Sequence, residues 1–290
     1  MTLTLMQIVI LALIQGLAEL LPVSSSAHVI AAAKLMGIDP SSPQFTLLLV
    51  MLHTGTMFAV ILYFWRAWKQ VFFSSRERTM QFVRVIVIAT IVTGIIALGF
   101  KVVLEKLIAH QHPGIAKAEI EELFKHLEIL AAALAAAGVL ILVAGLRSQR
   151  RGGREEIMDK DAVIIGAVQG LSLPFRGFSR SGSTISAGLL LGVAKTRLEE
   201  YSFALAVVLT PAVVAWEGRR LLHSGGQVGG PPIGVHDFIP GLLGMVFSFI
   251  GGLLALRLLS QLLERGKWWV FGVYCILAAG GLFFMYLQGY

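Results

Sequence analysis

The fold of this chain is decided by the stretch QGLAELLPVSSSAH at residues 15–28, which interrupts an apolar run. The run covers residues 1–37 and is long enough to cross a bilayer, but Pro22 and three consecutive serines break it near its middle. The residue before a proline disfavours the α conformation, so one helix should end here and another begin. Non-helical backbone at membrane depth is tolerated only where protein or a wet cavity surrounds it. The stretch therefore predicts two half-helices beside a polar cavity within a membrane.

A second broken run repeats this order of features. Residues 162–194 are apolar apart from an interruption at 174–183, and the letters QGL that open the first motif recur at 169–171. Three apolar spans follow each broken run. An odd number of crossings places the second copy on the opposite side, which predicts an inverted-topology repeat. We expect its halves to be 1–147 and 160–290.

Composition places the rest of the chain in a bilayer. Hydrophobic residues make up 56% of its 290 residues and charged residues 14%, against about 25% charged in soluble domains. We therefore expect a single membrane domain, an all-α integral membrane protein with about six transmembrane helices and two broken re-entrant hairpins. The predicted spans are Gln44–Trp65, Phe82–Phe100, Leu127–Leu146, Ser202–Trp216, Phe238–Leu256 and Trp268–Tyr286.

Basic loops predict the orientation. Arginines and lysines gather in loops 66–81 and 147–161, and the positive-inside rule makes that side cytoplasmic. Segment 101–126 then lies outside, where its amphipathic pattern predicts an interfacial helix, and loop 218–237 lies outside as well. The net charge of +7 reflects these loops and indicates no nucleic-acid partner. Cys275, the single cysteine, excludes an intramolecular disulfide.

The first motif predicts an anion site. Glu19 is the only residue with a full formal charge between Met1 and Lys34, and Gln15 lies four residues earlier on the same helix face. Serines 24–26 stand where the new helix begins, and a helix N-terminus with free amides and a positive dipole end favours an anion. His28 falls in the first turn of that helix.

The second motif adds a permanent cation. In GFSRSGST, at residues 177–184, hydroxyl residues again open a helix, and Arg180 presents a planar fork of donors that matches phosphate oxygens. If both half-helices point into one cavity, their polar groups suit the anionic headgroup of a lipid. The residues expected to bind this headgroup are Gln15, Ser24, Ser26, Gln169, Arg176, Ser179, Ser181, Gly182 and Thr184.

Simpler interpretations compete with these. A serine run in a membrane helix often only packs helices together, and Glu19 is either a proton relay or a structural partner of Arg180. His53, inside a predicted span, is expected to be an interhelical hydrogen-bond donor rather than a catalyst. Five other histidines are expected at the surface, namely His110, His112, His126, His223 and His236.

The two motifs together resemble those of the bacterial undecaprenyl pyrophosphate phosphatases, the BacA/UppP family. The likeness covers the whole chain in length, span count and motif placement. It implies hydrolysis of undecaprenyl diphosphate to the monophosphate carrier that cell-wall synthesis reuses, bacitracin tolerance, a divalent metal (Mg²⁺ or Ca²⁺) and a homodimer. The family's acidic motif, histidine and arginine carry over to Glu19, His28 and Arg180. Glu19 is the candidate metal ligand.

Two positions depart from the family pattern. Gln15 stands where many relatives have a second glutamate, which leaves Glu19 as the carboxylate of the motif. Arg176 stands directly before Gly177, where relatives usually have a proline; here Pro174 comes two residues earlier, so Arg176 could add a second cation.

The resemblance leads to a phosphoryl-transfer hypothesis. Arg180 would clamp the diphosphate, Ser25 is the first candidate nucleophile with His28 as its base, and Glu19 would hold the metal or orient His28. Direct attack by His28 or by water remains an alternative. The rival functions are a transporter or flippase of the lipid carrier, since broken helices in inverted repeats are typical of transporters, and a non-catalytic lipid-binding subunit. The resemblance implies a location in the bacterial inner membrane and an opening on the periplasmic side.

Overall fold

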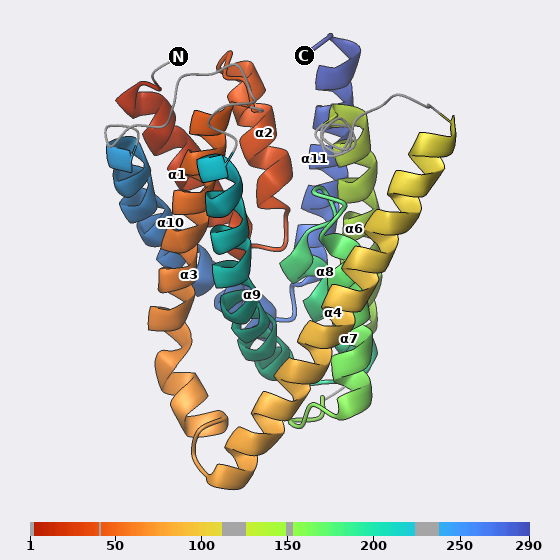
Figure 1. Ribbon diagram of the computed structural model, residues 1–290. Coiled ribbons are helices and arrows are strands. Elements are labelled where there is room, and N and C mark those ends of the chain that lie inside the picture. Colours follow the sequence, from red (N-terminus) through yellow and green to blue (C-terminus); the bar gives the residue numbers. More distant parts are fainter. Residues whose placement is uncertain (1–2, 41, 112–125, 149–152, 224–237) are drawn as a thin grey trace.

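A computed structural model describes residues 3–40, 42–111, 126–148, 153–223 and 238–290 of the chain, and the named elements of this part are all helices (Figure 1). Its helices are α1 (Leu5–Leu20), α2 (Ser25–Leu35), α3 (Pro43–Val71), α4 (Arg76–Gln111), α6 (Leu127–Ser148), α7 (Asp159–Ser172), α8 (Arg180–Leu190), α9 (Lys195–His223), α10 (Phe238–Glu264) and α11 (Trp269–Leu287).

Within the described residues, six helices are long and apolar enough to cross a bilayer, namely α3, α4, α6, α9, α10 and α11. Each contains one of the predicted spans, except that Trp268 lies just before α11. The prediction of a six-span helical membrane protein is confirmed. Large apolar side chains on them face outward, as Leu62 and Leu277 do with exposed fractions of 61% and 70%. In a bilayer, lipid covers such side chains.

The structure corrects two boundaries. Helix α9 begins at Lys195 and continues through Pro211, whereas the sequence predicts a shorter span, Ser202–Trp216, that this proline interrupts. Residues 101–111 continue α4, a helix of 36 residues and thus about 54 Å long, instead of opening a separate interfacial helix. The remainder of that predicted helix, 112–125, lies outside the described residues, as does most of the predicted outer loop 218–237.

The first hairpin leaves and returns to one face of the molecule. Thr4 caps α1 through a capping box with Gln7, and α1 ends at Leu20 because Leu21, which precedes Pro22, is extended with ψ of 151°. Helix α2 then runs back, so that the Gln7 side chain at the start of α1 donates to the Met36 carbonyl oxygen just after α2 (3.5 Å). This contact makes the segment re-entrant.

The second hairpin is closed in the same way. Arg154, before α7, exchanges backbone hydrogen bonds with Gly192 (2.9 Å) and Ala194 (2.8 Å), just after α8. Its guanidinium also pairs with the fully buried carboxylate of Asp161 at 3.0 Å. The start of α7 and the end of α8 therefore lie at one face.

The two hairpins enter from opposite faces. Arg84 near the start of α4 pairs with Asp159, and Gln81 with Glu156, which places the start of α7 beside the turn between α3 and α4. Figure 1 shows this turn at the bottom, with the N-terminus at the top. The breaks of both hairpins consequently meet in the interior.

Glycines from the repeated QGL letters pack both hairpins against long helices. A Cβ on Gly16 of α1 would lie 2.6 Å from the Ser248 carbonyl oxygen of α10, and one on Gly170 of α7 would lie 2.8 Å from that of Thr93 on α4. Small residues let helix backbones approach this closely in membranes. Helices α1 with α10 and α7 with α4 thus pack in the same manner.

Candidate active site

Each break ends in a serine with the same unusual backbone. Ser24 has φ 66° and ψ 94°, and Ser179 has φ 50° and ψ 96°. Residues other than glycine rarely adopt positive φ, and such backbone persists only where its surroundings enforce it. Both hydroxyls cap the helix that follows, accepting from the backbone N–H of Ala27 (3.4 Å) and Gly182 (3.2 Å). The two half-helices therefore present their N-termini by one shared device.

Direct contacts join the two breaks. The Ser24 hydroxyl donates to the Arg176 carbonyl oxygen (2.9 Å), and the Ser181 hydroxyl donates to that of Leu21 (3.4 Å). Gly182 lies so close that a Cβ there would be 3.2 Å from the Pro22 carbonyl oxygen. Residues about 155 positions apart in the sequence thus form one polar centre.

Glu19 is the hub of this centre. Its Oε2 accepts hydrogen bonds from the Ser25 hydroxyl (2.5 Å) and the Gln15 amide (3.2 Å), and its Oε1 accepts one from Arg180 (3.3 Å). The side chain retains 19% of its exposure. A carboxylate with these donors is held in a defined orientation, and the short bond from Ser25 is of the charge-assisted kind.

Arg180 is held from two sides. Its Nη2 donates to Glu19, and its Nη1 donates to the Ser202 carbonyl oxygen of α9 (3.3 Å). The Thr184 hydroxyl supports this arrangement, since it bonds both the Arg180 carbonyl oxygen (2.8 Å) and the Ser202 hydroxyl (2.7 Å). The guanidinium has five N–H donors, so donors remain for a ligand after these contacts.

His28 turns toward α11 rather than toward Ser25. Its Nδ1 faces the Ser24 carbonyl oxygen and its Nε2 faces the Tyr274 hydroxyl, both at 2.8 Å, and the two rings stack. A nitrogen that faces a carbonyl must carry the hydrogen, so in the neutral ring Nε2 accepts from Tyr274. The Ser25 hydroxyl therefore donates its hydrogen to Glu19. It does not donate to His28, which the sequence analysis predicted as its base.

Sequence reasoning missed two residues at this centre. Tyr274 has no local signal, because it sits in an apolar run. His53 on α3 was expected to link helices, and its Nε2 does reach across to α1, but its partner is Glu19 Oε2 at 3.6 Å. The available signal was an ionisable residue inside a membrane span, which is a functional candidate by default.

Some predicted residues lie elsewhere or make only backbone contacts at this centre. The Gln169 amide donates to Thr93 on α4 (3.0 Å), away from Glu19. Arg176 meets the centre through its carbonyl oxygen, and Ser26 is half-buried in the first turn of α2. Of the histidines expected at the surface, His126 is exposed and pairs with Glu128 (3.3 Å).

The side chains that the structure describes do not assemble a metal site by themselves. Among the residues that the structure describes, no three His, Cys, Asp or Glu side chains lie close enough to hold an ion. Glu19 stands beside Gln15, a neutral amide, and its oxygens already accept from Arg180, Ser25 and Gln15. The groups around Glu19 are hydrogen-bond donors, which suit an anion better than a cation held by the protein alone.

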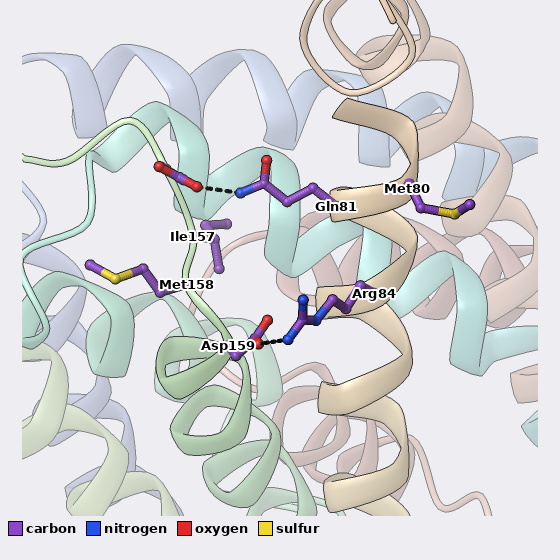
Figure 2. A pocket seen from close by; sticks show the side chains of 7 residues that line it. Met80, Gln81, Arg84, Ile157, Met158 and Asp159 are labelled. Carbon is purple, nitrogen blue, oxygen red and sulfur yellow. Dashed lines mark hydrogen bonds and ion pairs between the residues drawn. The ribbon is translucent and has the colours of Figure 1, made fainter. Parts of the chain in front are cut away.

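A separate hollow lies near the turn between α3 and α4. Figure 2 shows it between α4 and the start of α7, with Gln81 and Arg84 on one wall and Asp159 on the other. Glu156 also lines it. These four side chains pair across it. Its polar groups therefore satisfy one another, and it shares no residue with the Glu19 centre.

Comparison with known proteins decides the family. The model of the family described as bacitracin resistance protein BacA matches residues 8–281. The chain belongs to this family. Undecaprenyl-diphosphatase 2 of Acinetobacter baylyi is 53% identical over 279 residues, 95% of this chain and 96% of the relative. Undecaprenyl-diphosphatase 2 of Burkholderia ambifaria is 34% identical over 291 residues, 96% and 95% of the two chains.

The BacA match covers every residue of the Glu19 centre, from Gln15 on α1 to Tyr274 on α11. The family resemblance drawn from the two motifs is thus confirmed, and the match includes the whole polar centre of this BacA protein.

Proposed function

We propose that this chain hydrolyses undecaprenyl diphosphate to undecaprenyl phosphate and inorganic phosphate, and so recycles the lipid carrier. Membership of the BacA family and the near full-length likeness to proteins named undecaprenyl-diphosphatase support the substrate and the reaction. The observation that carries the chemistry is the 2.5 Å hydrogen bond from the Ser25 hydroxyl to Glu19, with Arg180 on the other oxygen of the same carboxylate. Nucleophile, base and anion-binding cation thus stand together.

Binding of the diphosphate would use the positive end of the centre. The first turns of α2 and α8 present backbone amides and the positive ends of two helix dipoles. Arg180 adds a permanent charge with free donors. These groups are fixed before the substrate arrives, and fixed donors aimed at developing charge are the main source of catalysis in phosphoryl transfer.

The reaction proposed has two steps. The Ser25 oxygen bonds to the terminal phosphorus, the bond from that phosphorus to the bridging oxygen breaks, and the lipid monophosphate leaves with the electron pair. The Ser25 proton moves to Glu19. Water then bonds to the phosphorus of the phosphoserine, the bond to Ser25 breaks, and Ser25 recovers the proton from Glu19. The attacking water loses one of its protons to solvent and keeps the other on the phosphate. Inorganic phosphate is then released.

A divalent cation is proposed to arrive with the diphosphate. Magnesium commonly binds through substrate phosphates and retained waters, with few protein ligands. Its contribution there would be to neutralise phosphate charge. The occupied oxygens of Glu19 support this order of binding over a site formed in the free protein.

The orientation and assembly are proposals of the same kind. The first hairpin opens on the face opposite the basic turn between α3 and α4, and the positive-inside rule makes that turn cytoplasmic. We infer that the centre opens to the periplasmic side of the bacterial inner membrane. The homodimer rests on the family resemblance, and light scattering of the protein in detergent would test it.

Phosphate release in detergent tests the function. Detergent leaves no membrane with two sides, so a protein that only transports the lipid carrier would give no phosphate release. The purified protein should release phosphate from undecaprenyl diphosphate, and Glu19→Gln and Arg180→Lys should lower kcat at least about 100-fold. Glu128→Gln and Arg197→Lys are matched controls, since both belong to ion pairs remote from the centre. Absence of phosphate release by the parent protein would refute the phosphatase and leave transport or lipid binding.

A further inference from the structure

His53 occupies a place at the centre that its own helix does not explain. Its Nδ1 bonds the Leu49 carbonyl oxygen one turn back on α3 (2.7 Å), which fixes the plane of the ring. Its Nε2 then lies 3.6 Å from Glu19 Oε2, at ion-pair distance. The side chain is 37% exposed. A histidine that served only to pack helices would be buried among them, whereas this one stands at the edge of the reacting groups.

The contacts of Glu19 divide into those that the reaction uses and those that it does not. Ser25 must leave Glu19 to bond phosphorus, and Arg180 must share its donors between Glu19 and the diphosphate. Gln15 lies on α1 like Glu19 itself, so it cannot hold α1 against another helix. Within the described residues, His53 is therefore the contact to Glu19 from another helix for which the diphosphate does not compete.

The helix that carries His53 is itself firmly placed. The Ser248 hydroxyl of α10 donates to the Leu52 carbonyl oxygen (2.9 Å), and a Cβ on Gly55 would lie 2.3 Å from the Met245 carbonyl oxygen. Ser248 of α10 also packs against Gly16 of α1, where a Cβ would lie 2.6 Å from its carbonyl oxygen. Helices α3, α10 and α1 thus form one close-packed unit around the His53 to Glu19 contact, and a rigid support of this kind is what holds a catalytic group to within a fraction of an ångström.

We propose that His53 is a positioning residue, which holds the Glu19 carboxylate in line with Ser25 while Arg180 and Ser25 engage the diphosphate. The inference rests on the proposed phosphatase function. It assigns to α3 a part in the reaction that neither sequence motif contains.

The test compares an apolar and a hydrogen-bonding replacement. His53→Leu should lower kcat about 10-fold to 100-fold, because misplacement of a catalytic group by about 1 Å has an effect of that size, with KM changed less than about twofold. His53→Gln, whose amide also reaches and donates, should recover most of kcat. His126→Leu is the matched control, since it removes a histidine paired with a glutamate outside the centre.

A double-mutant cycle asks whether His53 acts through Glu19. In a Glu19→Gln background, His53→Leu should produce little further loss of the residual rate, because the group that it positions is already gone. Equal losses in both backgrounds would overturn the proposal.

Other results have distinct meanings. An unchanged kcat in His53→Leu overturns the positioning role while leaving the phosphatase intact, and so does a raised KM at constant kcat, which would make His53 a substrate ligand. A Gln variant as slow as the Leu variant also overturns it. If the Leu variant fails to fold, His53→Asn, whose shorter amide falls short of Glu19, replaces it and should be slow. An inactive parent protein refutes the phosphatase function itself.

Discussion

The hydroxyl of Ser25 donates its hydrogen to Glu19, across the break between α1 and α2, at 2.5 Å. The two residues are six positions apart, and neither would meet the other on a continuous helix, where neighbours are three or four apart. The break at Pro22 turns α2 back so that its first residue faces the last turn of α1. The same break that opens the helix also couples the proposed nucleophile to its proposed base.

This coupling predicts a covalent intermediate. Ser25→Ala should lower phosphate release at least about 1,000-fold, since it removes the nucleophile, while Ser75→Ala, in the turn before α4, should act like the parent protein. Acid-quenched reactions of the parent should contain phosphoserine at residue 25, detected by mass spectrometry of its peptides. Phosphohistidine at His28, or an active Ser25→Ala protein, would move the nucleophile to His28 or to water.

Tyr274 should orient His28. Tyr274→Phe keeps the stacked ring but removes the hydroxyl that contacts His28 Nε2. The family resemblance places His28 at the active site, and loss of one such bond is worth about 1 kcal/mol, so kcat should fall about 5-fold. Tyr286→Phe, near the exposed end of the same helix α11, is the control. Parent-like kinetics of Tyr274→Phe would show that the hydroxyl is dispensable for His28.

A side chain at Gly182 should lower the stability of the protein. A Cβ there would lie 2.8 Å from Ile141 Cδ1 and 2.9 Å from the Ser179 hydroxyl, so Gly182→Ala should lower the free energy of unfolding by about 1–3 kcal/mol and reduce phosphate release with it. Gly280→Ala is the control, because nothing lies within 4 Å of a Cβ at that position. Thermal unfolding in detergent compares the two, and equal stability would contradict the tight fit between the breaks.

Metal binding should depend on the diphosphate. Calorimetric titration of Mg²⁺ or Ca²⁺ into the free protein should give no saturable heat of binding. The same titration into Ser25→Ala protein with undecaprenyl diphosphate bound should give a saturable heat of binding, because the phosphates supply most of the ligands. Chelation should then stop turnover without unfolding the protein. A saturable site in the free protein that Glu19→Gln abolishes would instead make Glu19 a resident metal ligand.

Local features of the sequence determined the architecture. Apolar runs long enough to cross a bilayer fix the six spans, and prolines followed by hydroxyl residues fix where two further runs break. These features act within a few residues of themselves, through backbone sterics and the transfer of side chains to lipid. The same breaks predicted that Glu19, Ser25 and Arg180 lie in one cluster, since inverted repeats bring broken helices together at the midplane.

Only the tertiary structure decided which other side chains join them. Gln15 and Gln169 open equivalent motifs, yet Gln15 bonds Glu19 and Gln169 bonds Thr93. His53 and Tyr274 reach the centre from α3 and α11, which are apolar spans with no motif of their own. Which face of a membrane helix turns inward depends on close packing against its neighbours, such as that of Gly16 and Gly55 on α10. The sequence thus determined that a polar centre exists, and packing determined its members, because interhelical contacts depend on rotation and depth that no local pattern records.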